Sequence, residues 1–139
     1  MANTRETIAL THEGALNMLA AAAARAAEMK VPQCIVIADA SGETIASLRM
    51  DGAKYLSMQT ARAKARTAAS INNVTGAMAP EFAVQAGIAT GGGVTGLPGG
   101  LPIRFGGRLA GGIGIGSGKG EEDVDVARAA LAAVGADEV

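Results

Sequence analysis

Residues 34–67 read CIVIADASGETIASLRMDGAKYLSMQTARAKART, and this stretch decides the fold. Residues 33–39 are almost continuously apolar, which predicts a buried strand. Ser41-Gly42 predicts a tight turn, and residues 43–49 then alternate as a second strand of a hairpin. A helix is expected over residues 53–71, because the residues of one face recur at steps of three and four. That face carries Leu56, Thr60, Lys64 and Thr67.

The segments on either side predict further helices and a second hairpin. A first helix is expected from Thr11, its N-cap, to about Met29, and a short one over residues 79–86. The apolar stripe of the first helix is Leu16, Leu19, Ala23 and Ala26 or Ala27. Residues 102–105 and 108–115, joined by Gly106-Gly107, predict a hairpin. The last helix opens with the acids Glu121, Glu122 and Asp123, which complement the helix dipole in a first turn, and its stripe is Val124, Ala127, Leu131 and Val134. This order predicts an α+β fold, with helices packed on an antiparallel sheet.

Length and composition predict one globular domain over residues 1–139. The chain is 49% apolar and 18% charged, but only 2% of its residues are aromatic. Its core must therefore use Ala, Ile, Leu, Val and Met. Because small side chains bury little area each, we expect additional burial through association of subunits.

Charge and patterning exclude several classes of function. A net charge of −1 and few aromatic residues provide neither a basic surface nor stacking platforms for nucleic acid. No apolar run is long enough to cross a bilayer, and the first residues lack the layout of a signal peptide, so a cytoplasmic protein is expected. Cys34 stands alone in a strand, which predicts a small core residue rather than a disulfide or a reactive thiol.

Charges of both signs meet where the second strand leads into the long helix. Arg49, Asp51 and Lys64 adjoin the most apolar strand, and charges beside a core are costly unless they are paired. One interpretation is an Arg49–Asp51 pair that fixes the turn, with Asp51 favoured near the helix N-terminus. The other is a ligand-binding cluster.

The glycine-rich segment over residues 87–120 contains two nucleotide-binding look-alikes. Residues 91–96 match G-x-G-x-x-G, but no clear strand precedes them and Pro98 interrupts the helix that should follow. Residues 111–120 resemble a phosphate loop, but Lys119 is followed by Gly120 instead of Ser or Thr. Neither match supports a nucleotide hydrolase. A weaker anion-binding role stays open, since glycine-rich backbone before a helix presents free N–H groups, but Glu121 and Glu122 argue against it by repelling an anion. The glycines instead predict close backbone approach of a neighbouring helix or of a ligand.

His12 is the only histidine, and two interpretations stay open for it. It is either a polar surface residue at a helix start or an axial ligand to a heme iron, for which one imidazole is sufficient. One His and one Cys do not make a zinc site, and no G-x-S-x-G elbow supports a serine hydrolase.

Motifs spread over nearly the whole chain resemble one known family. They are Val36-Ile37-Ala38-Asp39-Ala40-Ser41-Gly42, Arg49-Met50-Asp51-Gly52-Ala53, Ala61 with Lys64-Ala65 and Thr67-Ala68, Gly99-Gly100-Leu101-Pro102-Ile103, and Gly112-Ile113-Gly114-Ile115 with Asp123. In this order they resemble the GlcG/HbpS family, which includes the C-terminal domain of PduO. The R-M-D-G-A stretch with K-A-x-T-A downstream is the most specific part.

The resemblance implies a profilin-like α/β/α domain with a central antiparallel sheet of about five strands, assembled into homo-oligomers that are often octamers. It also implies heme or tetrapyrrole binding, in some members with heme degradation or redox sensing. In PduO-type domains a histidine near the first helix ligates heme, and His12 lies in the comparable region.

Three functional hypotheses follow. The first is an oligomeric heme-binding protein in which His12 ligates iron and Arg49 or Lys64 pairs with propionates. The ligand pocket is expected between the Arg49–Gly52 junction, the Lys64 helix and the glycine-rich loop. Its predicted ligand-binding residues are His12, Arg49, Met50, Lys64, Gly99 and Gly100.

The second hypothesis is an isomerase, tautomerase or lyase for a carboxylated catabolic intermediate. Arg49 or Lys64 would hold the carboxylate, and Asp51 or Asp39 would move a proton, so Asp51, Lys64 and Asp39 are its catalytic candidates. The third is an accessory oligomer in which the charged junction only holds subunits together.

Overall fold

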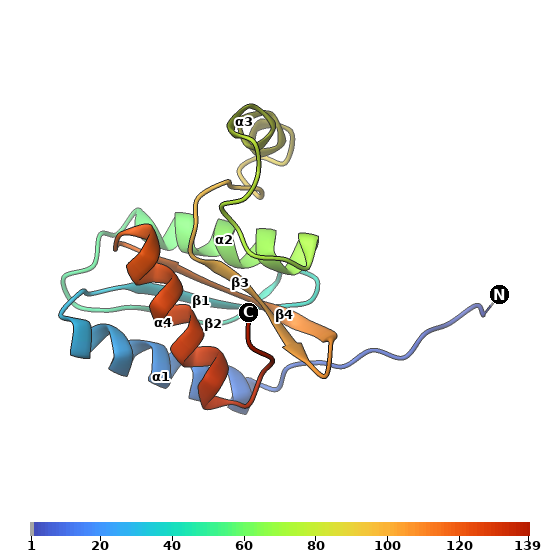
Figure 1. Cartoon of the computed structure of the whole chain (residues 1–139), viewed down its shortest axis with the longest axis horizontal. Helices are drawn as coiled ribbons and strands as arrows, with labels where there is room; N and C mark the ends of the chain where they lie inside the picture. The colour runs from blue at the N-terminus through green and yellow to red at the C-terminus, as the bar shows by residue number, and fades with distance from the viewer. Residues whose placement is uncertain (1) are drawn as a thin grey trace.

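The structure, a computed structural model, describes residues 2–139 (Figure 1). Within these residues it contains four helices and four strands. The strands are β1 (Cys34–Asp39), β2 (Thr44–Arg49), β3 (Gly100–Phe105) and β4 (Arg108–Gly116). The helices are α1 (His12–Met29), α2 (Ser57–Ile71), α3 (Pro80–Ala89) and α4 (Gly120–Ala133).

The four strands form one antiparallel sheet in the order β2-β1-β4-β3. Both predicted hairpins are present, and Gly42, Gly106 and Gly107 have the positive φ angles that tight turns require. The α+β class is therefore confirmed. The expected number of about five strands is one too many for the described residues, where the sheet has four.

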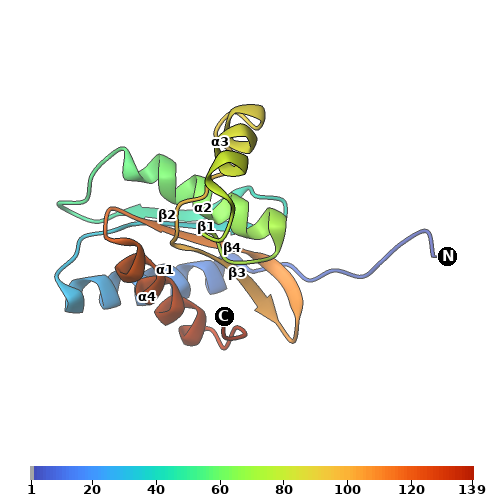
Figure 2. The ribbon, with the colours of Figure 1, turned by 45° about the horizontal axis from the view of Figure 1, so that its top comes forward.

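Helices cover both faces of the sheet, as Figures 1 and 2 show. α1 and α4 lie on one face, where Ile35 and Ile37 of β1 join their apolar side chains in the larger core cluster. α2 lies on the other face, against Val36 and Ala38 of the same strand. Side chains of a strand point alternately to its two faces, so the continuously apolar β1 contributes to both cores.

Glycines of β4 allow α2 to lie directly on the sheet. Gly112, Gly114 and Gly116 point toward α2, and a Cβ added to them would collide with the backbone oxygens of Ala65, Ala61 and Ser57 respectively. Two residues along a strand advance about 6.6 Å and four along a helix about 6 Å, so alternate strand positions match successive helical turns. Of the two explanations for this glycine segment, close approach of a helix holds at these positions.

The ends of α1 agree with the sequence, but its buried face is rotated. Thr11 is the N-cap, and its Oγ1 accepts a hydrogen bond from the backbone N of Gly14 at 3.0 Å. The side chains that enter the core are Ala15, Met18, Ala22 and Ala26. Leu16 was expected in the core and is instead 54% exposed, because a stripe one residue away buries the larger Met18.

The other helices differ from prediction at their ends, and α3 begins one residue later and ends three residues later than expected. α2 begins at Ser57 rather than Ala53, since residues 51–56 are mostly turns, and α4 begins one residue early. The buried face of α4 is also rotated from the predicted stripe, and its members are Asp123, Val126, Ala127, Ala130 and Leu131.

α3 stands away from the rest of the molecule in both views (Figures 1 and 2). None of its described residues is buried. Phe82 is 61% exposed, Val84 63% and Ile88 77%, so this helix presents a large apolar surface to its surroundings.

Candidate functional site

A buried ion pair joins α2 to the start of α4. Lys64 Nζ donates hydrogen bonds to Asp123 Oδ2 at 3.0 Å and to the backbone oxygen of Ile115 at 2.7 Å. The two charged side chains are only 6% and 2% exposed. Because an unpaired charge at this depth is very costly, each of these groups requires the other.

Burial dominates the electrostatics of Asp123. Loss of hydration raises the pKa of its carboxyl group, although the Lys64 ammonium and the backbone N–H of Gly118 both act in the opposite direction. The fully buried side chain of Gln33 lies beside the same loop. Neither its Nε2 nor its Oε1 has a hydrogen-bond partner within residues 2–139.

Gly99 and Gly100, two of the predicted ligand-binding residues, lie against Lys64. Gly99 has φ of +117°, and a Cβ there would lie 3.1 Å from Lys64 Nζ and 2.9 Å from the Cβ of Asp123. At Gly100 a Cβ would lie 2.5 Å from the backbone oxygen of Lys64. Glycine at position 99 makes room for the ammonium group, and glycine at position 100 makes room for the backbone of α2 beside the sheet.

The charged junction itself is not assembled around Lys64. Arg49 ends β2, an edge strand, while Lys64 lies over β4 and β3 on the other side of β1. Arg49 and Asp51 are exposed, and neither makes an ion pair among the described residues. Met50 is half-buried, and its Sδ accepts a hydrogen bond from the backbone N of Gln33 at 3.4 Å.

Asp39 has a local structural contact. Its Oδ1 accepts hydrogen bonds from the backbone N of Ser41 at 2.8 Å and of Glu43 at 3.0 Å, which closes the β1–β2 turn. Of the three catalytic candidates, only Lys64 therefore lies in a buried polar cluster, and its carboxylate partner is Asp123 rather than Asp51 or Asp39.

His12 is the first residue of α1 and is exposed. Its imidazole has no hydrogen bond or ion pair among the residues that the structure describes. Leu16 lies one turn further along and shares the face of His12, as residues four apart on a helix do. A free imidazole thus adjoins an exposed apolar side chain.

His12 and Lys64 lie in different regions of the molecule. Arg25 of α1 binds Asp125, two residues after Asp123, through Nε–Oδ1 at 2.9 Å, which joins the late part of α1 to the early part of α4. His12 is thirteen residues before Arg25, about 20 Å along the helix axis. The predicted ligand-binding residues therefore do not form one pocket.

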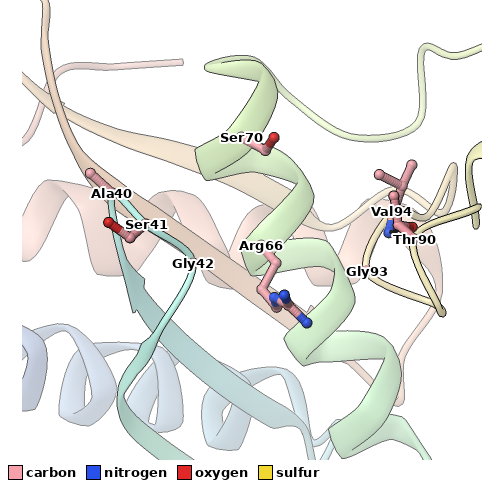
Figure 3. A pocket seen from close by; sticks show the side chains of 8 residues that line it. All are labelled: Ala40, Ser41, Gly42, Arg66, Ser70, Thr90, Gly93 and Val94. Atoms are coloured by element: carbon pink, nitrogen blue, oxygen red, sulfur yellow. Dashed lines mark hydrogen bonds between the residues drawn. The ribbon is translucent and has the colours of Figure 1, made fainter.

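Another hollow lies between the β1–β2 turn, α2 and the loop after α3. Figure 3 shows Arg66 projecting from α2 between Ser41-Gly42 on one side and Thr90 with Val94 on the other. The cavity measures about 240 Å³. Its only charged lining group is the exposed Arg66 guanidinium, so nothing buried defines a ligand there.

Two further observations limit the chemistry. Among residues 2–139, no three His, Cys, Asp or Glu side chains gather closely enough to hold a metal ion. Every helix in this range is too short or too polar to cross a lipid bilayer. Cys34 is buried and unpaired with another cysteine, and burial raises the pKa of its thiol against the attraction of Arg49.

Sequence reasoning missed the pairing of Asp123 and the burial of Gln33. Asp123 was interpreted as a first-turn acid that complements the helix dipole. A usable signal was its spacing, since Asp123 shares one helical face with Val126, Ala127 and Ala130. An acid on an apolar face implies a buried cationic partner. Gln33 directly precedes β1 and carries no comparable signal.

Fold and site together define a small α+β domain with a buried Lys–Asp pair at one end and a free histidine on its first helix. The chain belongs to the HbpS-like family, whose model, described as "Haem degrading protein HbpS-like", matches residues 10–132. The family resemblance in the sequence is thereby confirmed.

Solved and curated relatives agree with this assignment. A structure of a PduOC:heme complex superposes with a TM-score of 0.85 at 30% identity, covering 94% of this chain and 99% of the other. A double mutant of Streptomyces reticuli HbpS gives 0.82 at 31% identity, covering 95% and 91%. The corrinoid adenosyltransferase PduO of Citrobacter freundii is 35% identical over 94% of this chain. The chain spans 41% of the length of the curated relatives it matches.

Proposed function

We propose that this protein binds heme on the exposed face of α1, with His12 as an axial ligand. The observation that carries the proposal is an exposed imidazole without a partner among the described residues, in a family where PduOC forms a heme complex. Heme needs only one or two protein donors, so the lack of a multi-residue metal cluster within residues 2–139 does not conflict with it.

The residues of α1 fit such a ligand. Leu16, 54% exposed, supplies apolar contact one turn from His12, and Ala20 is exposed one turn further on. A porphyrin ring lying along this face meets small or apolar side chains. Bound heme would supply an iron centre for redox or oxygen chemistry, while the protein's part is to orient the ring and donate the imidazole.

Lys64 has no part in this proposal. Its ammonium is buried and paired with Asp123, and it lies at the other end of the domain from His12. Arg49 is exposed, but it pairs with Cys34, which begins β1 just after the end of α1. Arg49 therefore lies toward the end of α1, whereas His12 lies at its start. We therefore infer that propionates of a heme held by His12 are solvated or meet groups of another subunit.

The test is a hemin titration followed by visible spectroscopy, on the wild type and on His12→Ala. Because His12 is exposed, the substitution should leave the fold intact, and we expect hemin affinity to fall by about tenfold or more. His12→Ala is compared with Cys34→Ser, which removes the one thiol and should leave the spectrum of the complex unchanged.

The outcomes distinguish two questions: whether the protein binds heme, and whether His12 is the residue that ligates the iron. Equal binding by wild type and His12→Ala would keep heme but assign another axial donor. No specific binding by the wild type would reject heme. In that case the alternative of a small-molecule enzyme, centred on Lys64 and its partner Asp123, becomes the leading hypothesis.

We also infer self-association through α3. Phe82, Val84 and Ile88 are each more than half exposed on a helix that stands away from the body. An apolar surface of this kind on a small protein favours a protein–protein contact, and a second copy buries it symmetrically. Octameric assembly is part of this proposal and does not depend on heme. Heme degradation or redox sensing in the cytoplasm is also part of it, and both depend on heme binding being found first.

A further inference from the structure

A small cavity opens directly above the Lys64–Asp123 pair. It measures about 220 Å³ and lies between the first turns of α2, the loop at Leu97-Pro98 and the loop from β4 to α4. Figures 1 and 2 show that α2 and α4 begin at the same end of the molecule, where this cavity lies. It is separate from the His12 face of α1.

The buried ammonium group lines this cavity with an unused donor. Lys64 has three N–H donors, of which one goes to Asp123 Oδ2 and one to the Ile115 oxygen. The third hydrogen has no acceptor among the described residues. Since Lys64 is 5% exposed and lines the cavity, only a molecule inside the cavity has ready access to this donor.

Backbone and hydroxyl groups add further donors. Gly120 lines the cavity as the first residue of α4, and its N–H has no acceptor within the helix. Ser57 and Ser117 contribute hydroxyl donors, whereas the Thr60 hydroxyl already donates to the backbone oxygen of Ser57 at 3.2 Å and offers the cavity an acceptor. The positive end of the α4 dipole points into the same space.

The unpartnered amide of Gln33 lies behind the loop. A Cβ on Gly118 would lie 2.6 Å from Gln33 Nε2 and 2.7 Å from Asp123 Oδ1, so any other residue would force apart the cavity wall. Gly118 itself lines the cavity. Lys64 and Gln33, both buried, thus lie beside this loop, and of the two only Lys64 lines the cavity, with its third donor unused.

Charge and volume define the ligand class. Lys54 and Lys64 carry two positive charges and Asp123 one negative charge, which leaves the lining at +1. Glu121 and Glu122 do not line the cavity, and Glu122 Oε1 accepts a hydrogen bond from the backbone N of Lys119 at 2.8 Å. A cavity of this size is below the roughly 300 Å³ of drug-sized sites, so the ligand must be small.

We propose that this cavity binds a short carboxylic acid, whose carboxylate accepts hydrogen bonds from Lys64 Nζ and the Gly120 N–H. Lys54 contributes charge from the rim, and the hydroxyl groups of Ser57, Thr60 and Ser117 favour an acid that also carries a hydroxyl group. The proposal concerns binding and does not depend on heme.

The test is isothermal titration calorimetry of the full chain with lactate, propionate and inorganic phosphate at constant ionic strength. We expect lactate to bind more tightly than propionate, and phosphate to bind least, because the Asp123 carboxylate in the lining repels a dianion more strongly than a monoanion. Lys54→Gln should weaken lactate binding by about tenfold, the effect of losing one charge-assisted contact. Lys30→Asn removes a charge outside the cavity, keeps a residue that tolerates the left-handed conformation, and should change nothing.

A double variant tests the buried donor without leaving an unpaired charge. Lys64→Met combined with Asp123→Ala should abolish lactate binding while keeping the native circular-dichroism spectrum. Lactate binding that survives in a folded double variant, or that falls equally in Lys54→Gln and Lys30→Asn, would overturn the proposal. Phosphate binding in preference to both acids would overturn the carboxylate assignment and identify a phosphate ligand instead. Hemin binding by all these variants should match the wild type.

Discussion

The Lys64–Asp123 pair allows a double-mutant cycle whose outcome can be estimated from burial. Asp123→Ala leaves the Lys64 ammonium uncompensated at 6% exposure, and Lys64→Met leaves the Asp123 carboxylate uncompensated at 2%. Each single change should lower the free energy of unfolding by about 3–5 kcal/mol. The double variant buries no charge, so it should lose only the hydrogen bonds to the Ile115 oxygen and from the Gly118 N–H, about 2–4 kcal/mol together.

The assay is urea denaturation followed by circular dichroism, at one fixed protein concentration because association also changes apparent stability. We expect the double variant to be as stable as, or more stable than, either single variant, with a coupling energy of about 3 kcal/mol or more. The matched control is the surface pair Arg25–Asp125, 38% and 45% exposed, where the coupling should stay below about 1 kcal/mol. Additive losses at Lys64 and Asp123, within about 0.5 kcal/mol, would refute the inference that the charges require each other.

Three other predictions follow from the structure. Gly114→Ala should destabilise by about 3 kcal/mol or more in thermal unfolding, because its Cβ collides with the backbone of α2, whereas Gly14→Ala in α1 should be neutral or stabilising. Burial raises the pKa of Asp123 above its ordinary 3.8, so the stability it contributes is present below that value and is lost as pH rises through the folded pKa. Relative to Asp123→Asn, the wild type should therefore lose unfolding free energy as the pH rises above 3.8 in urea titrations, and a gain would contradict the sign. Phe82→Ser with Ile88→Ser should lower the mass measured by light scattering toward the 13.7 kDa of one chain, and an unchanged oligomer would reject α3 as the contact.

Local sequence patterns were sufficient to predict the helices and strands but not how they are arranged in space. Both hairpins follow from runs of strand-forming residues that flank glycine turns, and such turns are determined by residues adjacent in the sequence. The pairing of β1 with β4 joins Cys34 to Gly116, which are far apart in the chain. No local rule specifies this contact, so the central part of the sheet had to come from the structure.

The buried face of α1 was predicted one residue out of place because its composition gives little contrast. Nearly half of the helix is alanine, and alanine is equally compatible with either face. Only Leu16, Met18 and Leu19 distinguish one possible buried face from the other, and Met18 is the one that is fully buried in the core. This small error matters for function, since it leaves Leu16 exposed beside His12.

Nearness in sequence also suggested the wrong neighbours for Lys64. Arg49 and Asp51 are close to it along the chain, yet its carboxylate partner lies 59 residues away in α4. The reason is the sheet order, which places β4 and the start of α4 under α2 and leaves β2 at the edge. An ion pair between non-adjacent elements becomes predictable only when that order is known.

The glycines of β4 connect the fold to the proposed carboxylate site. Because Gly114 and Gly116 carry no side chain, α2 lies close enough to the sheet for Lys64 to reach the backbone oxygen of Ile115, the residue between them. A larger residue at either position would lift α2 and withdraw the ammonium group from Asp123. The glycine pattern that resembled a phosphate loop therefore acts through helix packing, and its effect on a ligand is indirect: it determines how deeply the Lys64 ammonium lies beneath the cavity.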